Sequence, residues 1–128
     1  MYKPPPHEKR AFGAMVEQAA ARFLLQHGLS LLCHSFSCRA GEIDLIMREQ
    51  DVIVFVEVRY RRNPRHGTAA ATVTWHKQRR ITHTAKVFLA SRGLTDRHAC
   101  RFDVVGISPH AATGRLQFDW IRDAFSAA

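Results

Sequence analysis

Gly41-Glu-Ile-Asp-Leu-Ile-Met47 and Val52-Ile-Val-Phe-Val-Glu-Val-Arg-Tyr60 form the central apolar stretch of the sequence, and a polar break over 48–51 separates them. β-Branched and aromatic residues dominate both segments, which is the composition of strands. Polar residues concentrated at the break mark a turn. The stretch therefore predicts two neighbouring strands of a β-hairpin.

Two carboxylates of this hairpin are expected to lie side by side. A turn centred midway between Gln50 and Asp51 sets Asp44 opposite Glu57, where opposed Cβ atoms lie about 4.5–5.5 Å apart. Like charges at that distance are destabilising unless a cation lies between them, and carboxylate oxygens favour Mg²⁺ or Mn²⁺. Arg59 points to the same face as Glu57, where its charge can bind a phosphate.

The alternative is that Asp44 and Glu57 are solvated residues on the exposed face of the ribbon. The strand is apolar on both sides of Glu57, however, which favours a central strand buried on both faces. An unpaired carboxylate in such a strand is costly. The sequence therefore predicts a metal site at Asp44 and Glu57.

The net charge points to a nucleic-acid partner. The 128 residues carry a formal charge of +8, which favours a polyanion. We expect nucleic acid in preference to a membrane, because no basic amphipathic surface helix stands out and no apolar run approaches the ~18 residues that span a bilayer. No apolar secretory segment follows the start of the chain, so we expect a cytoplasmic protein. Whether it forms a homodimer is left open.

The cysteines are expected to be reduced. The chain has an odd number of cysteines, Cys33, Cys38 and Cys100, and they lie in or beside apolar segments. This favours free core residues over a disulfide framework. A zinc site from Cys33, His34 and Cys38 is the alternative, but structural zinc needs four closed ligands and no second ligand pair follows.

The remaining chain predicts one α/β domain over residues 9–128 after a disordered tail at 1–8, with a central mixed sheet flanked by helices. The expected elements besides the hairpin are a helix over 9–26, a strand over 29–38, a helix over 74–92, a strand over 100–107, and a last strand or short helix over 116–125. Glu17 falls at the margin of the apolar stripe of the first helix. Its alternative is an ordinary solvated residue.

Two basic segments are expected to contact nucleic acid, namely the loop after the hairpin and the start of the second helix. Their candidate residues are Arg61, Arg62, Arg65 and His66 in the loop and Lys77, Arg79 and Arg80 in the helix. The alternative for the loop is a solubilising role. Trp75 is expected to pack into the core, with exposure for stacking on a base as its alternative.

These residues together resemble the YraN-type family of endonuclease-like proteins, relatives of Holliday-junction resolvases within the PD-(D/E)XK nuclease superfamily. The match runs from about Gly13 to Phe125. It rests on Glu17-Gln-Ala-Ala20, Gly41-Glu-Ile-Asp-Leu-Ile46, Val54-Phe-Val-Glu-Val-Arg-Tyr-Arg61, Lys77 with Arg80-Ile81, and Arg101-Phe-Asp-Val-Val105.

The resemblance implies a restriction-endonuclease-like core that hydrolyses phosphodiester bonds with Mg²⁺ or Mn²⁺. It favours DNA over RNA as the substrate, branched or structured DNA included. It implies a catalytic set of Glu17, Asp44, Glu57 and Arg59, with Asp44 and Glu57 as the metal ligands. Arg59 stands where the superfamily has lysine; it keeps the charge but cannot be deprotonated. A catalytically inactive nucleic-acid-binding protein of the same fold therefore remains an alternative, as does a protein-interaction module in a DNA-handling complex.

Overall fold

The structure, a computed structural model, describes residues 5–65, 67–95 and 97–127. It confirms the predicted α/β class, consistent with a restriction-endonuclease-like core. The elements in chain order are α1 (Pro6–Gln26), β1 (Ser30–Cys38), β2 (Gly41–Glu49), β3 (Val52–Tyr60), the short 3₁₀ helix η1 (Ala70–Thr72), α2 (Trp75–Ser91), β4 (Cys100–Pro109) and β5 (Leu116–Phe125). The segment for which a strand and a short helix were both open is a strand.

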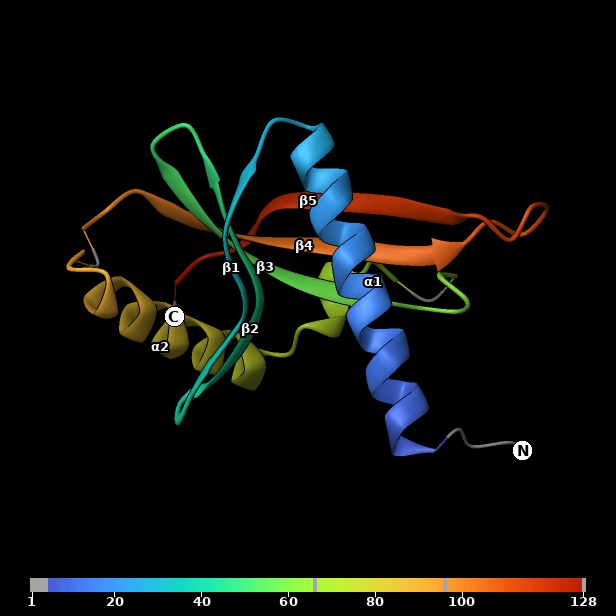
Figure 1. The fold of residues 1–128 in the computed structure, drawn as a ribbon, viewed down its shortest axis with the longest axis horizontal. Coiled ribbons are helices and arrows are strands. Elements are labelled where there is room, and N and C mark those ends of the chain that lie inside the picture. Colours follow the sequence, from blue (N-terminus) through green and yellow to red (C-terminus); the bar gives the residue numbers. More distant parts are fainter. Residues whose placement is uncertain (1–4, 66, 96, 128) are drawn as a thin grey trace.

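The sheet is mixed, with the strands in the order of the chain, β1-β2-β3-β4-β5. β3 and β4 run parallel, whereas the other neighbouring strands pair antiparallel. A parallel pair needs a crossover connection, which η1 and α2 supply. Figure 1 shows α1 crossing the sheet near its middle and α2 running beside the β1–β2 hairpin.

Each face of the sheet carries its own hydrophobic core. Ile53 and Phe55 of β3 belong to the cluster that α2 covers, while Val54 and Val56 belong to the cluster that α1 covers. This alternation follows from the strand geometry and confirms that β3 is buried on both faces. By the same alternation, Glu57 lies on the side of α2.

The helix ends follow local sequence signals. α1 begins at Pro6, earlier than predicted, because proline at the first turn has no N–H to leave unpaired. α2 begins after Thr74, whose Oγ1 accepts the backbone N–H of Lys77 at 3.3 Å. Among the described residues, no helix combines the length and apolar character needed to span a bilayer.

A buried carboxylate ties β4 to β5 through the Arg101-Phe-Asp segment. Asp103 is fully buried and accepts hydrogen bonds from the Arg101 guanidinium, from Trp120 Nε1 at 2.9 Å and from the Asp123 backbone N–H at 2.9 Å. Arg101 also pairs with Glu49 of β2 at 2.8 Å. This segment, which belongs to the resemblance stated above, therefore has a structural role in the fold.

Candidate active site

β2 and β3 separate where the predicted carboxylates lie. The two strands pair as far as Leu45 opposite Val56, the register that the predicted turn requires. Beyond this pair, Asp44 Oδ2 accepts the backbone N–H of Val58 at 2.8 Å. The parting of the β1–β2 hairpin from β3 is visible in Figure 1. Asp44 is therefore held against β3, beside Glu57, where the sheet opens.

Glu57 is buried and only partly satisfied. It is 2% exposed, and its Oε1 has no hydrogen-bond partner among the described residues. Burial, followed by the negative charge of Asp44, raises the pKa of Glu57 to about 8, while the charges of Lys77 and Arg59 oppose the rise. A buried carboxyl with an unpaired oxygen beside a second carboxylate is stabilised by a proton or by a metal cation.

Arg59 lies two residues further along β3 and presents the opposite kind of unpaired atom. Its Nε is buried and has no hydrogen-bond partner among the described residues. A buried guanidinium N–H without an acceptor is costly, and a phosphate oxygen is a geometrically suitable acceptor for it. β3 thus offers an unpaired acceptor at Glu57 and an unpaired donor at Arg59 on the same face.

Lys77 approaches Glu57 from α2. Its Nζ lies 3.9 Å from Glu57 Oε2, and its side chain is 33% exposed. The sequence placed Lys77 with the nucleic-acid contacts, and no local pattern joins it to Glu57, because the two residues meet only when α2 packs on the sheet. A lysine therefore lies beside the acidic pair, Asp44 and Glu57, although position 59 of β3 carries arginine.

Glu17 comes to the site from α1 and is oriented by β1. Its Oε1 accepts a hydrogen bond from Ser35 Oγ at 3.0 Å and lies 3.9 Å from His34 Nε2. Burial, followed by the charge of Asp44, raises the pKa of Glu17, whereas Ser35 and His34 lower it and Glu42 raises it slightly. The structure therefore brings all four predicted catalytic residues, Glu17, Asp44, Glu57 and Arg59, to one region.

The sequence analysis missed the contribution of two polar residues of β1 to this site, because it considered His34 only as a zinc ligand and did not consider Ser35. Ser35 has a φ of 54°, a left-handed conformation that is uncommon for a residue other than glycine and often marks a functional site. The pairing of His34 with Leu45 sets Ser35 opposite Asp44. The available signal was the polar interruption His34-Ser35 in a strand that was expected to be apolar.

The donor set fits a hard divalent cation. Within the described ranges, no three histidine, cysteine, aspartate or glutamate side chains are grouped closely enough to hold a metal ion alone. Cys33, His34 and Cys38 therefore do not form the alternative zinc site, and the three cysteines are free, as expected. Mg²⁺ commonly uses one or two carboxylates plus waters and phosphate oxygens. Asp44 and Glu57, with its unpaired Oε1, match that requirement.

The loop after β3 packs towards β4 and β5. Arg61 donates a hydrogen bond from Nη1 to the Gly67 carbonyl at 2.9 Å and lines a depression with residues of both strands. Arg62 and Arg65 are exposed, whereas His66 lies outside the described residues. Nucleic-acid contact by this loop stays a prediction.

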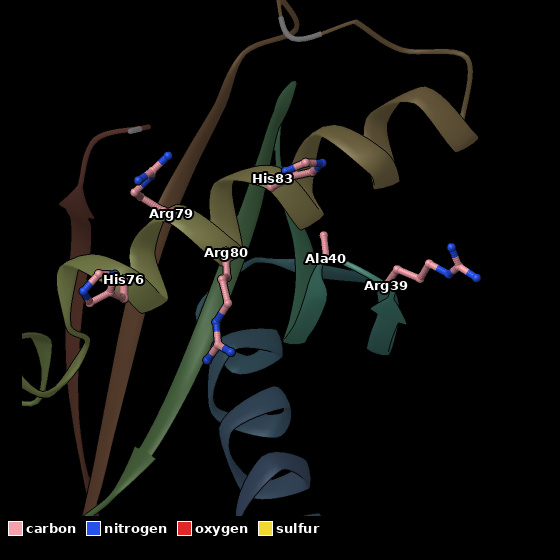
Figure 2. Close-up of a pocket in the computed structure, with 6 residues that line it drawn as sticks. All are labelled: Arg39, Ala40, His76, Arg79, Arg80 and His83. Atoms are coloured by element: carbon pink, nitrogen blue, oxygen red, sulfur yellow. The ribbon is translucent and has the colours of Figure 1, made fainter.

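The basic residues of α2 line an open cavity of about 720 Å³ beside the β1–β2 turn. Figure 2 shows four of its side chains projecting from successive turns of α2, with Arg39 and Ala40 at the turn. The α2 residues are His76, Arg79, Arg80 and His83. Lys77, Arg79 and Arg80, predicted together, thus divide between the acidic pair and this cavity.

Trp75 does not pack into the core, and that prediction was wrong. Its side chain is 58% exposed at the first position of α2. The Arg79 guanidinium lies 4.8 Å from the centre of its ring. The core beneath α2 is filled instead by residues from later turns, such as Ile81 and Phe88, so Trp75 remains outside it.

Comparison with known proteins agrees with the predicted resemblance. A family model described as "Uncharacterised protein family UPF0102" matches residues 16–107, a range that includes the four predicted catalytic residues and Lys77. A UPF0102 protein of Pectobacterium carotovorum is 51% identical, over 92% of this chain and 96% of the relative. UPF0102 proteins of Chromohalobacter salexigens and Nitrosomonas europaea are 48% and 50% identical, over 94% and 88% of this chain and 95% and 92% of the relatives. The chain therefore belongs to the UPF0102 family.

Proposed function

We propose that this protein is a metal-dependent endonuclease that hydrolyses phosphodiester bonds in DNA. One observation carries the proposal: β3 presents the buried, unpaired Oε1 of Glu57 and the buried, unpaired Nε of Arg59. The first atom lacks a cation or proton and the second lacks an anion. A metal-bound phosphodiester supplies both.

Asp44 and Glu57 would hold Mg²⁺ or Mn²⁺, which supplies charge stabilisation at the phosphate and an activated water. The residues prepare the site in separate ways. The Val58 N–H fixes Asp44 Oδ2, so this carboxylate is oriented before a ligand arrives. Arg59 binds a phosphate oxygen through its unpaired Nε.

Lys77 supplies a second positive charge at the acidic pair. Its charge favours the ionised form of Glu57, the form that binds a cation. Its partly exposed side chain also allows a phosphate to approach it. In this proposal Lys77 contributes the lysine charge that β3 lacks at position 59.

Glu17 is the third carboxylate of the site. The hydrogen bond that Ser35 Oγ donates fixes Oε1 of Glu17, and the charge of Asp44 helps to raise the pKa of Glu17. A carboxylate held in this way accepts a hydrogen bond from a water molecule on the α1 side of the acidic pair. Glu17 is therefore proposed to position that water.

A catalytically inactive nucleic-acid-binding protein is the second candidate. It is favoured by Arg59, since an arginine cannot act as a base where the superfamily carries lysine. The two candidates share the metal site and the basic surface, and they differ in turnover.

Cleavage assays separate the two candidates. Purified protein is expected to cut DNA in Mg²⁺ or Mn²⁺ and not in EDTA, with linear, single-stranded, flap and four-way DNA as substrates. Asp44→Asn and Glu57→Gln are expected to abolish cutting while DNA binding persists, and Asp51→Asn, in the exposed β2–β3 turn, is the matched control. Tight binding without cleavage of any substrate would favour the second candidate, and cleavage that survives both variants would point to a contaminant.

A further inference from the structure

The outward side of α2 carries an exposed aromatic ring among basic side chains. We call it the α2 outer face, and it consists of Trp75, His76, Arg79, Arg80, His83 and Lys86, all exposed. Trp75 and Arg79 are four residues apart and therefore adjacent on the helix, with the guanidinium 4.8 Å from the ring centre.

The charges of this face are not balanced within the helix. The sequence of α2 contains no aspartate or glutamate. None of the ion pairs within the described residues joins a carboxylate to Arg79 or Arg80. Like charges three and four residues apart destabilise a helix, and an external polyanion would remove that repulsion.

The face is hollowed on the side of the β1–β2 turn. Arg39 of the turn joins residues of α2 around the cavity of about 720 Å³ (Figure 2). A concave surface lined by arginine and histidine offers several donors to successive phosphates of one strand. The shape and the charge therefore select a nucleic-acid backbone.

The exposed ring restricts the form of that nucleic acid. In a duplex the bases stack on each other and present no free face, so a duplex would use the phosphate contacts alone. An unpaired base can stack on a tryptophan, and grooves for single strands combine basic and aromatic side chains in this way. Trp75 thus adds affinity only where bases are unpaired.

We propose that the α2 outer face binds a single-stranded segment of nucleic acid, with one base stacked on Trp75 and its phosphates in the cavity lined by Arg39, Arg79 and Arg80. This inference rests on the proposed nuclease function and specifies its substrate class, which is DNA with an unpaired stretch beside the cleavage site. Lys77 contacts Glu57 and lines, together with Arg80, a depression beside the β1–β2 turn, so Arg80 connects the α2 outer face to the acidic pair.

Binding measured in EDTA tests the inference independently of cleavage. Fluorescence anisotropy would compare oligo-dT of about 15 nucleotides with a duplex of equal length. Trp75→Ala is expected to weaken oligo-dT binding on the order of tenfold and duplex binding less than about twofold, since stacking is lost and phosphate contacts remain. Leu25→Ala is the matched control, because Leu25 is an exposed apolar residue, 48% exposed, on α1.

Two further variants separate stacking from charge. Arg80→Gln is expected to weaken the binding of oligo-dT and of the duplex to a similar extent. It should also reduce the slope of log K against log salt concentration by about 1. Quenching of tryptophan fluorescence by oligo-dT is expected in the wild-type protein and absent in Trp75→Phe, in which Trp120 is the remaining tryptophan. Its presence in Trp75→Phe would contradict stacking at Trp75.

The outcomes distinguish this inference from the proposed function. Unchanged oligo-dT affinity in Trp75→Ala, or equal loss for both ligands, would overturn the inference even if the wild-type protein cleaves DNA. Selective loss for oligo-dT would support it even if no cleavage is found. Absence of binding to any nucleic acid would overturn both.

Discussion

Lys77 Nζ lies 3.9 Å from Glu57 Oε2, so the first turn of α2 meets the centre of the sheet at these two side chains, which carry opposite charges once Glu57 is ionised. Glu57 is 2% exposed, and the contact is therefore little screened by solvent. The position of Lys77 at the acidic pair distinguishes it from the exposed cations of α2, Arg79, Arg80 and Lys86.

Lys77→Gln is expected to reduce the cleavage rate about tenfold or more, with DNA affinity changed less than about threefold. The reason is that in the proposed function Lys77 acts on the acidic pair and the reacting phosphate, whereas the other cations supply most of the binding. Single-turnover rates and anisotropy titrations measure the two effects. Lys86→Gln removes a charge of the α2 outer face and is therefore expected to affect binding, but it should leave the rate at saturating DNA unchanged. Equal loss of that rate in the two variants would show that helix charge alone matters.

The raised pKa of Glu57 predicts a pH-dependent stability. The folded protein holds a proton on Glu57 up to about pH 8, whereas the unfolded chain releases it near the ordinary value of 4.5. The free energy of unfolding contributed by this group is therefore fully present below pH 4.5 and is lost as the pH rises through about 8, by at most about 1.4 kcal/mol per unit. Urea unfolding of the metal-free protein at pH 5.5 and pH 8.5 measures it. Glu57→Gln should flatten the dependence, and an unchanged slope would contradict the assignment.

Arg59→Lys is expected to retain or increase cleavage, because lysine keeps a cation beside the phosphate and restores the superfamily pattern at this position. In Arg59→Ala the cleavage rate is expected to fall at least about tenfold, since the phosphate then lacks this positive charge. Rates at saturating metal give the comparison. Higher activity in Arg59→Ala than in Arg59→Lys would exclude a phosphate contact at this position.

Asp103→Asn is expected to lower the free energy of unfolding by about 3 kcal/mol or more, because the fully buried position then loses its charged contact with Arg101, which keeps its contact with Glu49. Denaturant unfolding in EDTA measures the loss. Asp119→Asn, at an exposed position of β5, is the matched control and should change stability by less than about 0.5 kcal/mol. A loss equal to that of the control would contradict the structural role of Asp103.

The hairpin and its acidic pair could be predicted because their signals are local. Alternation along β3 and the centre of one turn fix the placement of Asp44 relative to Glu57, and the observed pair of Leu45 with Val56 has that register. Lys77 and Ser35 could not be assigned to the site in this way. Their approach depends on how α2 and β1 pack against the hairpin, which no spacing in the sequence encodes.

Trp75 and Asp103 show two further limits of the sequence. The average burial of tryptophan placed Trp75 in the core, but its position in the first turn of α2 directs it to solvent. Asp103 stands in an apolar strand much as Glu57 does. The difference is in the partners: Asp103 is saturated by Arg101 and two N–H donors, whereas Glu57 keeps an unpaired oxygen. The pattern of partners, rather than burial, separates the structural carboxylate from the candidate ligand.

The proposed function depends on a divalent cation held by Asp44 and Glu57, and calorimetric titration of Mn²⁺ into the wild-type protein and into Asp44→Asn tests for that cation. The wild-type protein is expected to bind Mn²⁺, and Asp44→Asn should weaken binding about tenfold or more because one of the two anionic ligands becomes neutral. Asp51→Asn, at the exposed turn, should bind as the wild-type protein does. Equal Mn²⁺ affinity in Asp44→Asn and the wild-type protein would contradict the account.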